Sequence, residues 1–532
     1  MKQKSNLAII TNDTIDQKTI NGLINNIIKN QDYRLEIIIN YKDKNLFKSE
    51  HFLSYYFILF YKWIDKLLYK KHRPASHSNT DSKKIYNVSN LNNLYEIIEL
   101  RNIDFIVFFC SFNNISKICK TSNVKAITYE FGTWIDSDWR FIGLNEILER
   151  RPTSIIRIVY FNLLGQRKVL RTARTQSILK SWYLNKKSII AKLLFMIPRE
   201  LSKLNDEFFQ PQNEIIYSSN KKKLNQFNLD VINGISLIKR FFKLFFYLIT
   251  RLYNRTFFHT NWTIGFVKVL DHYNYDFINS IIFKPPSSYI TWADPFFIEK
   301  ENKIYLFFEE KIKDTNGHIS IMILDKDGNI IDEPKIILKQ DHHLSFPNVF
   351  EINDEFYMLP ESIESNSLNL YKSIKFPYKW RMQRQLLKGS YADPSIIFFD
   401  EYYWIFVTKS CVPSASSNDE LYIYHTSDLN TGKIYCHPQN PVKTSCRQSR
   451  NGGAIHIYDD KIIRVAQETN FEYGEKVKLF HISELSPTSF KEELLKVIDT
   501  SWKESILGLH TLNFNDQYAV FDMKRKKLKY VG

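Results

Sequence analysis

Ionisable side chains recur at the openings of five short strand-like segments in the second half of the chain. They are Asp294 in "TWADPFF", His343 in "HLSFPNVFE", Asp393 in "YADPSII", Arg450 in "SRNGGAI" and His510 in "LGLHTLN". Carboxylates with imidazole and guanidinium groups nearby suit general acid–base chemistry on hydroxyl groups, such as those of sugars. A strand pair needs no such groups for its own folding, so these residues are candidates for a site.

Each opening leads into a hairpin, and the second strand of three hairpins ends on another polar side chain: Glu310, Glu361 or Gln467. The predicted catalytic residues are Asp294, Asp393 and Glu361, and the predicted substrate-binding residues are His343, Arg450, Gln467, His510 and Glu310. An Asp-Pro pair can also serve only to fix a turn and bind backbone amides. For any single residue, therefore, a structural role stays open beside the functional one.

The hairpins themselves repeat. The segments "DPFFIEKENKIYLFFEE", "PNVFEINDEFYMLPES", "DPSIIFFDEYYWIFVT", "GAIHIYDDKIIRVAQE" and "HTLNFNDQYAVFDM" share a polar or small opening, an apolar strand, a polar turn and a second, mostly aromatic strand. Five such units, roughly 45–65 residues apart, predict an all-β five-bladed β-propeller over residues 262–532. The innermost strand of each propeller blade starts at the central channel, so the five openings are expected to converge on one funnel.

Residues 1–165 have a different texture. Continuous apolar runs in "NLAIIT", "RLEIIINY" and "DFIVFFC" alternate with segments of helical periodicity such as "LNNLYEIIEL". This alternation predicts an α/β, Rossmann-like domain with a parallel sheet. No glycine follows the first strand in "ITNDTIDQ", so the dinucleotide-binding fingerprint is absent.

Residues 166–261 are basic and are predicted to form a helical connector. Within them, "ISLIKRFFKLFFYLITRLYNRTFF" at 235–258 is dense in apolar residues but carries five Lys or Arg residues. It is too charged to span a membrane, yet it could lie on an anionic membrane surface. The alternative is a helix packed between domains with its basic face in water.

The formal net charge of +16 favours anionic partners such as phosphorylated substrates or an acidic membrane face. Lys and Arg are dispersed, with no nucleic-acid-reading motif, so nucleic acid is not an expected partner. Five cysteines without metal-ligand spacing indicate a reducing compartment, and neither a metal nor a resident cofactor is predicted. The expected location is cytoplasmic, peripheral at the inner membrane face.

The repeated motifs, together with "DLNTGKIYCHPQNPV" and "AQETNFEYGEKVKLFHISELS", resemble the propeller at the N-terminus of plant glucosamine inositolphosphorylceramide transferases and of many bacterial surface-glycan proteins. That propeller is similar to the five-bladed fold of arabinanase and fructosidase glycoside hydrolases, which use two aspartates and a glutamate. The resemblance implies that Asp294 and Asp393 stand where the two aspartates are expected. Glu361 departs from the pattern, because it precedes Asp393 whereas the hydrolases place their acid after it.

The N-terminal half resembles a formyltransferase-type domain fused to this propeller in bacterial relatives, through "AITYEFGTWIDSDWRFIGLNEILERRPTSIIRIVYFNLLGQRKVL". Formyltransferases need an Asn-His-Asp set, and "DFIVFFCSFNNISK" contains no His. The domain is then expected to act as a platform for a nucleotide sugar or an acceptor. The donor-binding candidates are Glu130, Asp136, Asp138 and Arg140.

These observations predict a carbohydrate-active, glycosyltransferase-like enzyme of bacterial surface polysaccharide or lipid-linked glycan biosynthesis, whose propeller funnel binds sugar and whose donor is a nucleotide sugar. Two alternatives stay open. One is a glycoside hydrolase of the five-bladed propeller type. The other is a non-catalytic glycan-binding propeller beside a degenerate formyltransferase domain.

Overall fold

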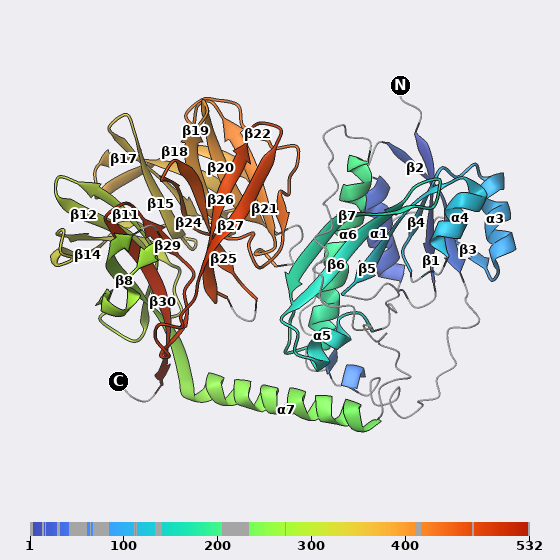
Figure 1. Ribbon diagram of the computed structural model, residues 1–532, viewed down its shortest axis with the longest axis horizontal. Helices are drawn as coiled ribbons and strands as arrows, with labels where there is room; N and C mark the ends of the chain where they lie inside the picture. Colours follow the sequence, from blue (N-terminus) through green and yellow to red (C-terminus); the bar gives the residue numbers. More distant parts are fainter. Residues whose placement is uncertain are drawn as a thin grey trace. The chain divides into compact units, whose positions relative to one another are not determined.

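A computed structural model describes residues 4–12, 15, 17–28, 32–41, 61–63, 65–66, 85–110, 112, 114–132, 141–204, 234–271, 273–410, 416–470 and 473–529. The chain forms two compact units (Figure 1). One consists of Met1–Ile249 with Cys411–Ser416, and the other of Thr250–Ser410 with Ser417–Gly532. None of the helices in the described ranges is both long and apolar enough to cross a bilayer.

The N-terminal unit is built on a seven-stranded sheet of order β3-β2-β1-β4-β5-β6-β7. Its strands are β1 (Ser5–Thr11), β2 (Tyr33–Tyr41), β3 (Ile85–Val88), β4 (Phe105–Phe108), β5 (Lys125–Phe131), β6 (Thr153–Phe161) and β7 (Arg167–Gln176). The first five of these strands are parallel. The predicted parallel sheet is therefore confirmed.

The helices described before the propeller are α1 (Gln17–Ile28), α3 (Leu91–Leu100), α4 (Ile115–Ser122), α5 (Leu144–Leu148), α6 (Trp182–Lys203) and α7 (Gly234–Phe257). Strand β1 is an uninterrupted apolar run because both faces of the sheet are covered, and Leu7 through Ile10 are completely buried. Helix α6 packs against α1, where the Asn26 side chain donates a hydrogen bond to the Leu194 carbonyl.

The prediction of a helical connector over 166–261 was wrong for its first part. Residues 167–176 form strand β7, which pairs antiparallel with β6 and completes the sheet. Buried and partly buried residues alternate along most of "RKVLRTARTQ", but its arginines made this strand pattern hard to recognise in the sequence. One of them, Arg171, points inward, where it forms an ion pair with the fully buried Glu200 of α6 at 3.4 Å. A buried charge is tolerated there because it has an opposite partner.

The C-terminal unit holds five antiparallel sheets, and the predicted five-bladed propeller is confirmed. The first blade consists of β11 (Ile290–Lys300), β12 (Lys303–Ile312), β13 (His318–Leu324) and β14 (Ile330–Leu338), and the second of β15 (Ser345–Ile352), β16 (Glu355–Glu361), β17 (Ser367–Lys375) and β18 (Lys379–Lys388). The third blade consists of β19 (Tyr391–Phe399), β20 (Tyr402–Lys409), β21 (Glu420–Thr426), β22 (Tyr435–Cys436) and β23 (Lys443–Thr444). The fourth consists of β24 (Asn451–Tyr458), β25 (Lys461–Glu468), β26 (Lys476–Leu485) and β27 (Phe490–Ile498).

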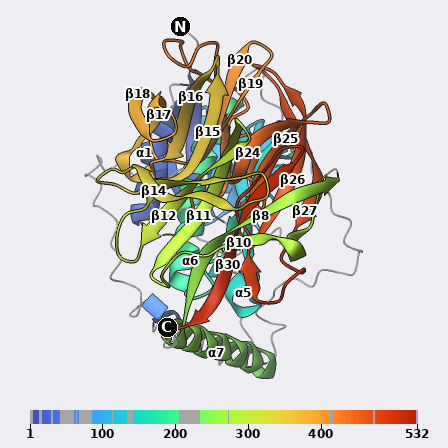
Figure 2. The same cartoon turned by 90° about the vertical axis from the view of Figure 1, so that its left-hand side faces the viewer.

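The fifth blade combines both ends of this unit. It consists of β8 (Phe258–Asp271), β9 (Asn274–Tyr275), β10 (Ile281–Phe283), β28 (Ile506–Gly508), β29 (Leu512–Phe514) and β30 (Tyr518–Leu528). Figure 2 shows β8 and β30 side by side, and they pair from Tyr518↔Lys268 to Leu528↔Phe258. This pairing joins both ends of the unit in one blade and so closes the ring.

Apolar clusters join each blade to the next. Five clusters each contain residues of two neighbouring blades: Phe521 and Val465, Val520 and Phe308, Phe307 and Met358, Leu359 and Ile405, and Phe406 and Ile462. Because each such cluster is shared by two blades, burial of apolar surface drives closure of the whole ring rather than folding of single blades.

Hydrogen bonds also connect the innermost strands β11, β15, β19, β24 and β29 into a closed circuit. The donors and acceptors are Phe346 N to Asp294, Asn348 Nδ2 to Pro394 O, Ser395 Oγ to Gly453 O, Ala454 N to Asn513 Oδ1, and Asn513 Nδ2 to Pro295 O. The five strand openings therefore lie around one axis, as the sequence repeat predicts.

Candidate functional site

Three of the blade openings are β-bulges in front of a proline. The strand register skips two residues at Asp294-Pro295, at Phe346-Pro347 and at Asp393-Pro394. The bulged residues have φ of 50°, 47° and 43°, a left-handed conformation that is unfavourable outside glycine. In the second blade, Phe346 therefore occupies the bulge position that Asp294 and Asp393 occupy in the first and third blades. His343 lies three residues before this position.

A carboxylate holds each bulge in place. The backbone N–H of Asp294 donates to Asp522, that of Phe346 donates to Asp294, and that of Asp393 donates to Glu361. These hydrogen bonds give the acidic residues a structural task and offset the strained backbone. The structural role considered for Asp294 and Asp393 is therefore real, and it fixes both carboxylates in orientation.

A first cluster of charges surrounds His510. Its Nε2 lies 3.0 Å from Asp294 Oδ1, and its Nδ1 lies 2.7 Å from Asp522 Oδ2. Thr511 also donates to Asp294 Oδ1, at 2.7 Å. Burial alone would lower the pKa of His510, but the two carboxylates outweigh it and raise the pKa to about 10. At neutral pH the ring is an imidazolium held between two acids.

Glu309 lies beside this cluster. Burial, followed by repulsion from Asp294, raises the pKa of Glu309 to about 8, so the side chain holds a proton near neutral pH. Its Oε1 is 3.4 Å from Nε2 of His343, whose Nδ1 accepts a hydrogen bond from Gly317 N. Burial, and after it Lys311, lowers the pKa of His343. A neutral imidazole and a carboxylic acid therefore face each other.

A second cluster surrounds Asp393. Arg450 contacts both carboxylate oxygens of Asp393, at 2.5 and 3.0 Å, and lies 3.3 Å from Glu361. Gln467 Nε2 donates to Asp393 at 2.6 Å. Burial and the adjacent Asp393 raise the pKa of Glu361 well above its ordinary value, although Arg450 opposes them. This cluster pairs an oriented carboxylate with a carboxyl group whose pKa is raised.

Aromatic rings link the two clusters. The Tyr473 ring lies 5.1 Å from the His510 ring and 5.1 Å from the Arg450 guanidinium carbon. The Trp262 ring lies 4.1 Å from that of His510 on the same cluster. Tyr473 is 38% exposed, whereas the charged residues beneath it are buried. An apolar surface over a few convergent polar groups is the usual composition of a small-molecule site.

Glycines permit the close approach of blades four and five at this point. A Cβ on Gly453 would lie 2.2 Å from the Leu512 carbonyl oxygen, and one on Gly452 would lie 2.8 Å from the His510 carbonyl oxygen. The "NGG" of the fourth opening is therefore required by packing, and it brings Arg450 and His510 into one region.

The structure thus brings together seven of the eight predicted propeller residues: Asp294, His343, Glu361, Asp393, Arg450, Gln467 and His510. The eighth, Glu310, lies inside the first blade and not with the other seven. It accepts hydrogen bonds from Trp292 and Ser320 and pairs with His318 inside the blade. Side chains alternate along a strand, so Glu309 faces the funnel and Glu310 faces away.

Sequence reasoning also missed Asp522, Tyr473 and Trp262. Asp522 lies four residues after Tyr518 in "YAVFDM", at the position that Glu361 holds after Tyr357 in "YMLPES". Aligning the five units by their second strands would have found it. Tyr473 lies in a loop and Trp262 in the strand before the first opening, where the repeat gives no signal.

In the N-terminal unit, Glu130 forms a bidentate ion pair with Arg167, at 3.0 and 2.8 Å. Because β5 and β7 hold these two side chains together, Glu130 has a structural partner. The other donor-binding candidates, Asp136, Asp138 and Arg140, lie outside the described residues.

Asp294, His510 and Asp522 offer ligand atoms within 4.8 Å of one another and so could in principle hold a metal ion. Both ring nitrogens of His510 face carboxylates, so the same three side chains also form the ion triad described above.

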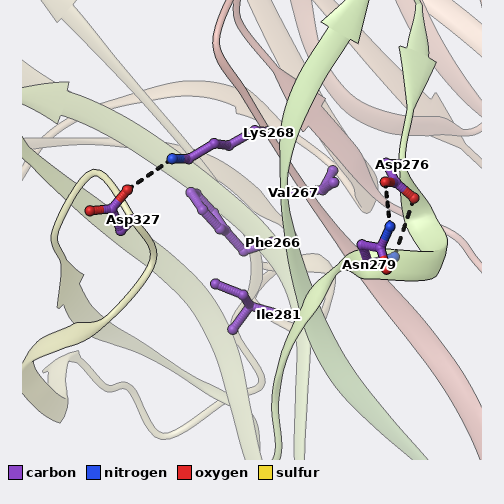
Figure 3. Close-up of a pocket in the computed structure, with 7 residues that line it drawn as sticks. All are labelled: Phe266, Val267, Lys268, Asp276, Asn279, Ile281 and Asp327. Carbon is purple, nitrogen blue, oxygen red and sulfur yellow. Dashed lines mark hydrogen bonds and ion pairs between the residues drawn. The ribbon is translucent and has the colours of Figure 1, made fainter.

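A separate pocket of about 220 Å³ lies on the outer part of the fifth blade (Figure 3). Its charged side chains already have partners: Lys268 pairs with Asp327 at 2.8 Å, and Asp276 accepts from Asn279. The lining between them is Phe266, Val267 and Ile281. It lacks the buried acid–base groups of the funnel, so the funnel is the stronger candidate.

Comparison with known proteins places this propeller among relatives. Residues 280–519 match the family described as "Glucosamine inositolphosphorylceramide transferase 1, N-terminal". The chain is 35% identical over 211 residues to glucosamine inositolphosphorylceramide transferase 1 of Arabidopsis thaliana, covering 39% of this chain and 27% of that protein. It is 33% identical over 210 residues to the Oryza sativa subsp. japonica protein of the same name, covering 39% and 28%. The chain thus spans little more than a quarter of these relatives.

Solved structures with distant similarity to this chain include glycoside hydrolases and a phosphorylase. A family 117 glycoside hydrolase of Zobellia galactanivorans is 11% identical, with a TM-score of 0.34 over 50% of this chain and 90% of that one. The α-L-arabinanase of Cellvibrio cellulosa is 14% identical, with a TM-score of 0.29 over 38% and 77%. Similarities this low concern the fold only.

Proposed function

We propose that this protein is a carbohydrate-active transferase of bacterial surface polysaccharide or lipid-linked glycan assembly, and that its propeller funnel binds the sugar. The observation that carries this proposal is the pair of buried acid–base clusters, around His510 and Asp393, that meet beneath the exposed ring of Tyr473. The curated relatives of the propeller, which are named glucosamine inositolphosphorylceramide transferase 1, support the same class of reaction.

Each catalytic candidate has a role that its surroundings favour. Glu361 retains its proton and would donate it to the oxygen of the leaving group. Asp393, fixed by Arg450 and Gln467, would orient the sugar hydroxyls. Asp294 would accept the hydrogen of a bound hydroxyl, with the His510 imidazolium stabilising negative charge beside it.

The donor in this proposal is a nucleotide sugar. The N-terminal unit, with its parallel sheet and its resemblance to a formyltransferase-type domain, would serve as the platform for the donor or acceptor. The enzyme would work in the cytoplasm, peripheral at the inner membrane face. There residues 235–258 would meet an anionic lipid surface and a lipid-linked acceptor.

Ligand titration with matched variants tests the funnel. Calorimetric titration with a panel of sugars and nucleotide sugars should give binding to the wild-type chain. Glu361→Gln should retain that binding and lose turnover by at least a hundredfold, because general acid catalysis contributes about 10²–10⁴ in rate. Glu355→Gln, at the exposed opposite end of β16, is the control and should behave like wild type. Turnover unchanged in Glu361→Gln would refute the assignment.

Hydrolysis is the second candidate, because a protonated carboxylic acid beside an oriented carboxylate also serves glycosidases. Aryl glycosides distinguish the two activities. Release of the aryl group without any nucleotide sugar, and its loss in Glu361→Gln, would favour a hydrolase. Binding of glycans with neither activity would leave a non-catalytic propeller.

A further inference from the structure

Helix α7 presents a long exposed apolar stripe. Its members recur at intervals of three or four residues: Phe242, Phe245, Phe246, Ile249, Leu252, Tyr253 and Phe257, each between 43% and 65% exposed. At 100° per residue these positions fall within an arc of about 140° along a helix of about 36 Å. The first four belong to the N-terminal unit and the last three to the propeller unit, and each half shows the same face.

The opposite face of α7 already has a partner in the N-terminal unit. Leu244 is 3% exposed and packs with Leu148 and Trp182, while Arg240 pairs with Glu149 at 2.9 Å. The helix therefore has one satisfied apolar face and a second, exposed one. A helix that merely covers a core needs only the first, so the outer stripe requires another explanation.

Charge limits what can cover this stripe. The 24 residues of α7 include five basic and no acidic side chains. Lys239 and Lys243 flank the stripe on one side, whereas Arg240, Arg251 and Arg255 fall on the opposite face of the helix. Three more lysines gather where β30 meets the end of the helix: Lys526 donates to Asn254, Lys529 binds the Arg255 carbonyl, and Lys527 is close enough to lower the pKa of His259, after the larger effect of burial.

We propose that α7 lies in the interface of an anionic phospholipid bilayer, with the Phe242–Phe257 stripe among the acyl chains and the lysines on the headgroups. This inference rests on the proposed membrane location and deepens it by assigning the face of α7 that enters the bilayer. A linear stripe on one straight helix (Figure 1), bordered by cations and free of acids, matches a planar anionic surface. A protein partner would more commonly present mixed charges to such a rim.

Vesicle co-sedimentation of the full chain, without sugar, tests the proposal. The wild type should bind vesicles of phosphatidylcholine with 30% phosphatidylglycerol and bind pure phosphatidylcholine far less. Phe242→Gln with Phe246→Gln should weaken binding at least tenfold. Phe398→Gln, at a residue of similar exposure (55% against 58% for Phe242) on β19, is the control and should not weaken it.

The electrostatic part has its own variant. Lys239→Gln with Lys243→Gln should weaken binding to the anionic vesicles about thirtyfold, given roughly a factor of five for each surface lysine. Unchanged vesicle binding in the stripe variants, or no binding by a folded wild type, would overturn the proposal. Dimerisation that is lost in the Phe variants, without vesicle binding, would assign the stripe to a second copy instead. Sugar titration without vesicles reports the funnel separately, so either result can fail alone.

Discussion

Replacing His510 by glutamine should destabilise the propeller in a way that depends on pH. The imidazolium lies between Asp294 and Asp522. Glutamine keeps most of the volume and can hydrogen-bond to one carboxylate, but it carries no charge. The variant leaves two buried acids without their counter-ion, which is among the costly single changes in a protein interior.

The magnitude follows from the raised pKa of His510. Its folded-state pKa of about 10 exceeds the ordinary value of 6.5, so the imidazolium stabilises the fold fully below pH 6.5. That contribution is lost as pH rises from 6.5 through 10. A difference of 3.5 pKa units corresponds to at most about 5 kcal/mol at about 1.36 kcal/mol per unit. We expect His510→Gln to lower the free energy of unfolding by about 3–5 kcal/mol at pH 7, in line with broken buried ion pairs.

Urea denaturation of both proteins at pH 7, 8.5 and 10 measures this effect, with propeller unfolding followed by tryptophan fluorescence. The gap between wild type and variant should be widest at pH 7 and should nearly close at pH 10. Labelled-histidine NMR gives an independent check, because one imidazole resonance should titrate near pH 10 and be missing from the variant. A gap that is constant between pH 7 and 10 would refute the ion-triad interpretation.

Three further outcomes are expected. Arg464→Met should lower the free energy of unfolding by about 3–5 kcal/mol, because it leaves the buried Glu492 side chain with only the more distant Lys443, at 3.4 Å, as a counter-ion. Adding Glu492→Leu should restore most of this loss, as measured by urea denaturation. The Glu361→Gln variant should be more stable than wild type at pH 9. The raised pKa of the Glu361 carboxyl means that the wild type loses stability as pH rises, and the glutamine does not titrate. Thermal unfolding at pH 5 and 9 measures this difference. Leu193→Ala, in the core of the N-terminal sheet, should cost about 2–5 kcal/mol and shift only the melting transition of that unit in calorimetry.

The strand repeat was sufficient to predict the propeller and the convergence of its openings. Each unit encodes its own hairpin through local alternation and turn residues, and closure follows because every blade needs an apolar neighbour. The spacing of the strand openings alone did not distinguish Glu309 from Glu310. Adjacent acids at a strand end differ only in which face they occupy, and the register at the Asp294 bulge decides that.

Other features were beyond a single-sequence argument. The sequence of β7 was interpreted as helical because an arginine at an inward-facing strand position is unexpected. Arg171 is tolerated there because Glu200, 29 positions later in the chain, neutralises it. Tyr473 belongs to a loop, and nothing in its neighbours indicates that it lies between Arg450 and His510. Such contacts arise from tertiary structure, which overrides local propensity.

The pairing of β8 with β30 has a consequence for synthesis of the chain. The strand that begins at Phe258 can form the central hydrogen bonds of its blade only after Leu528, about 270 residues later, has been synthesised. A ribosome adding about 5–20 residues per second would leave that edge open for roughly 15–50 seconds. During this time the nascent β8 is a template for pairing with other chains. Truncation before Tyr518 should therefore produce an aggregating polypeptide rather than a four-bladed fragment, and chaperone demand should peak late in translation.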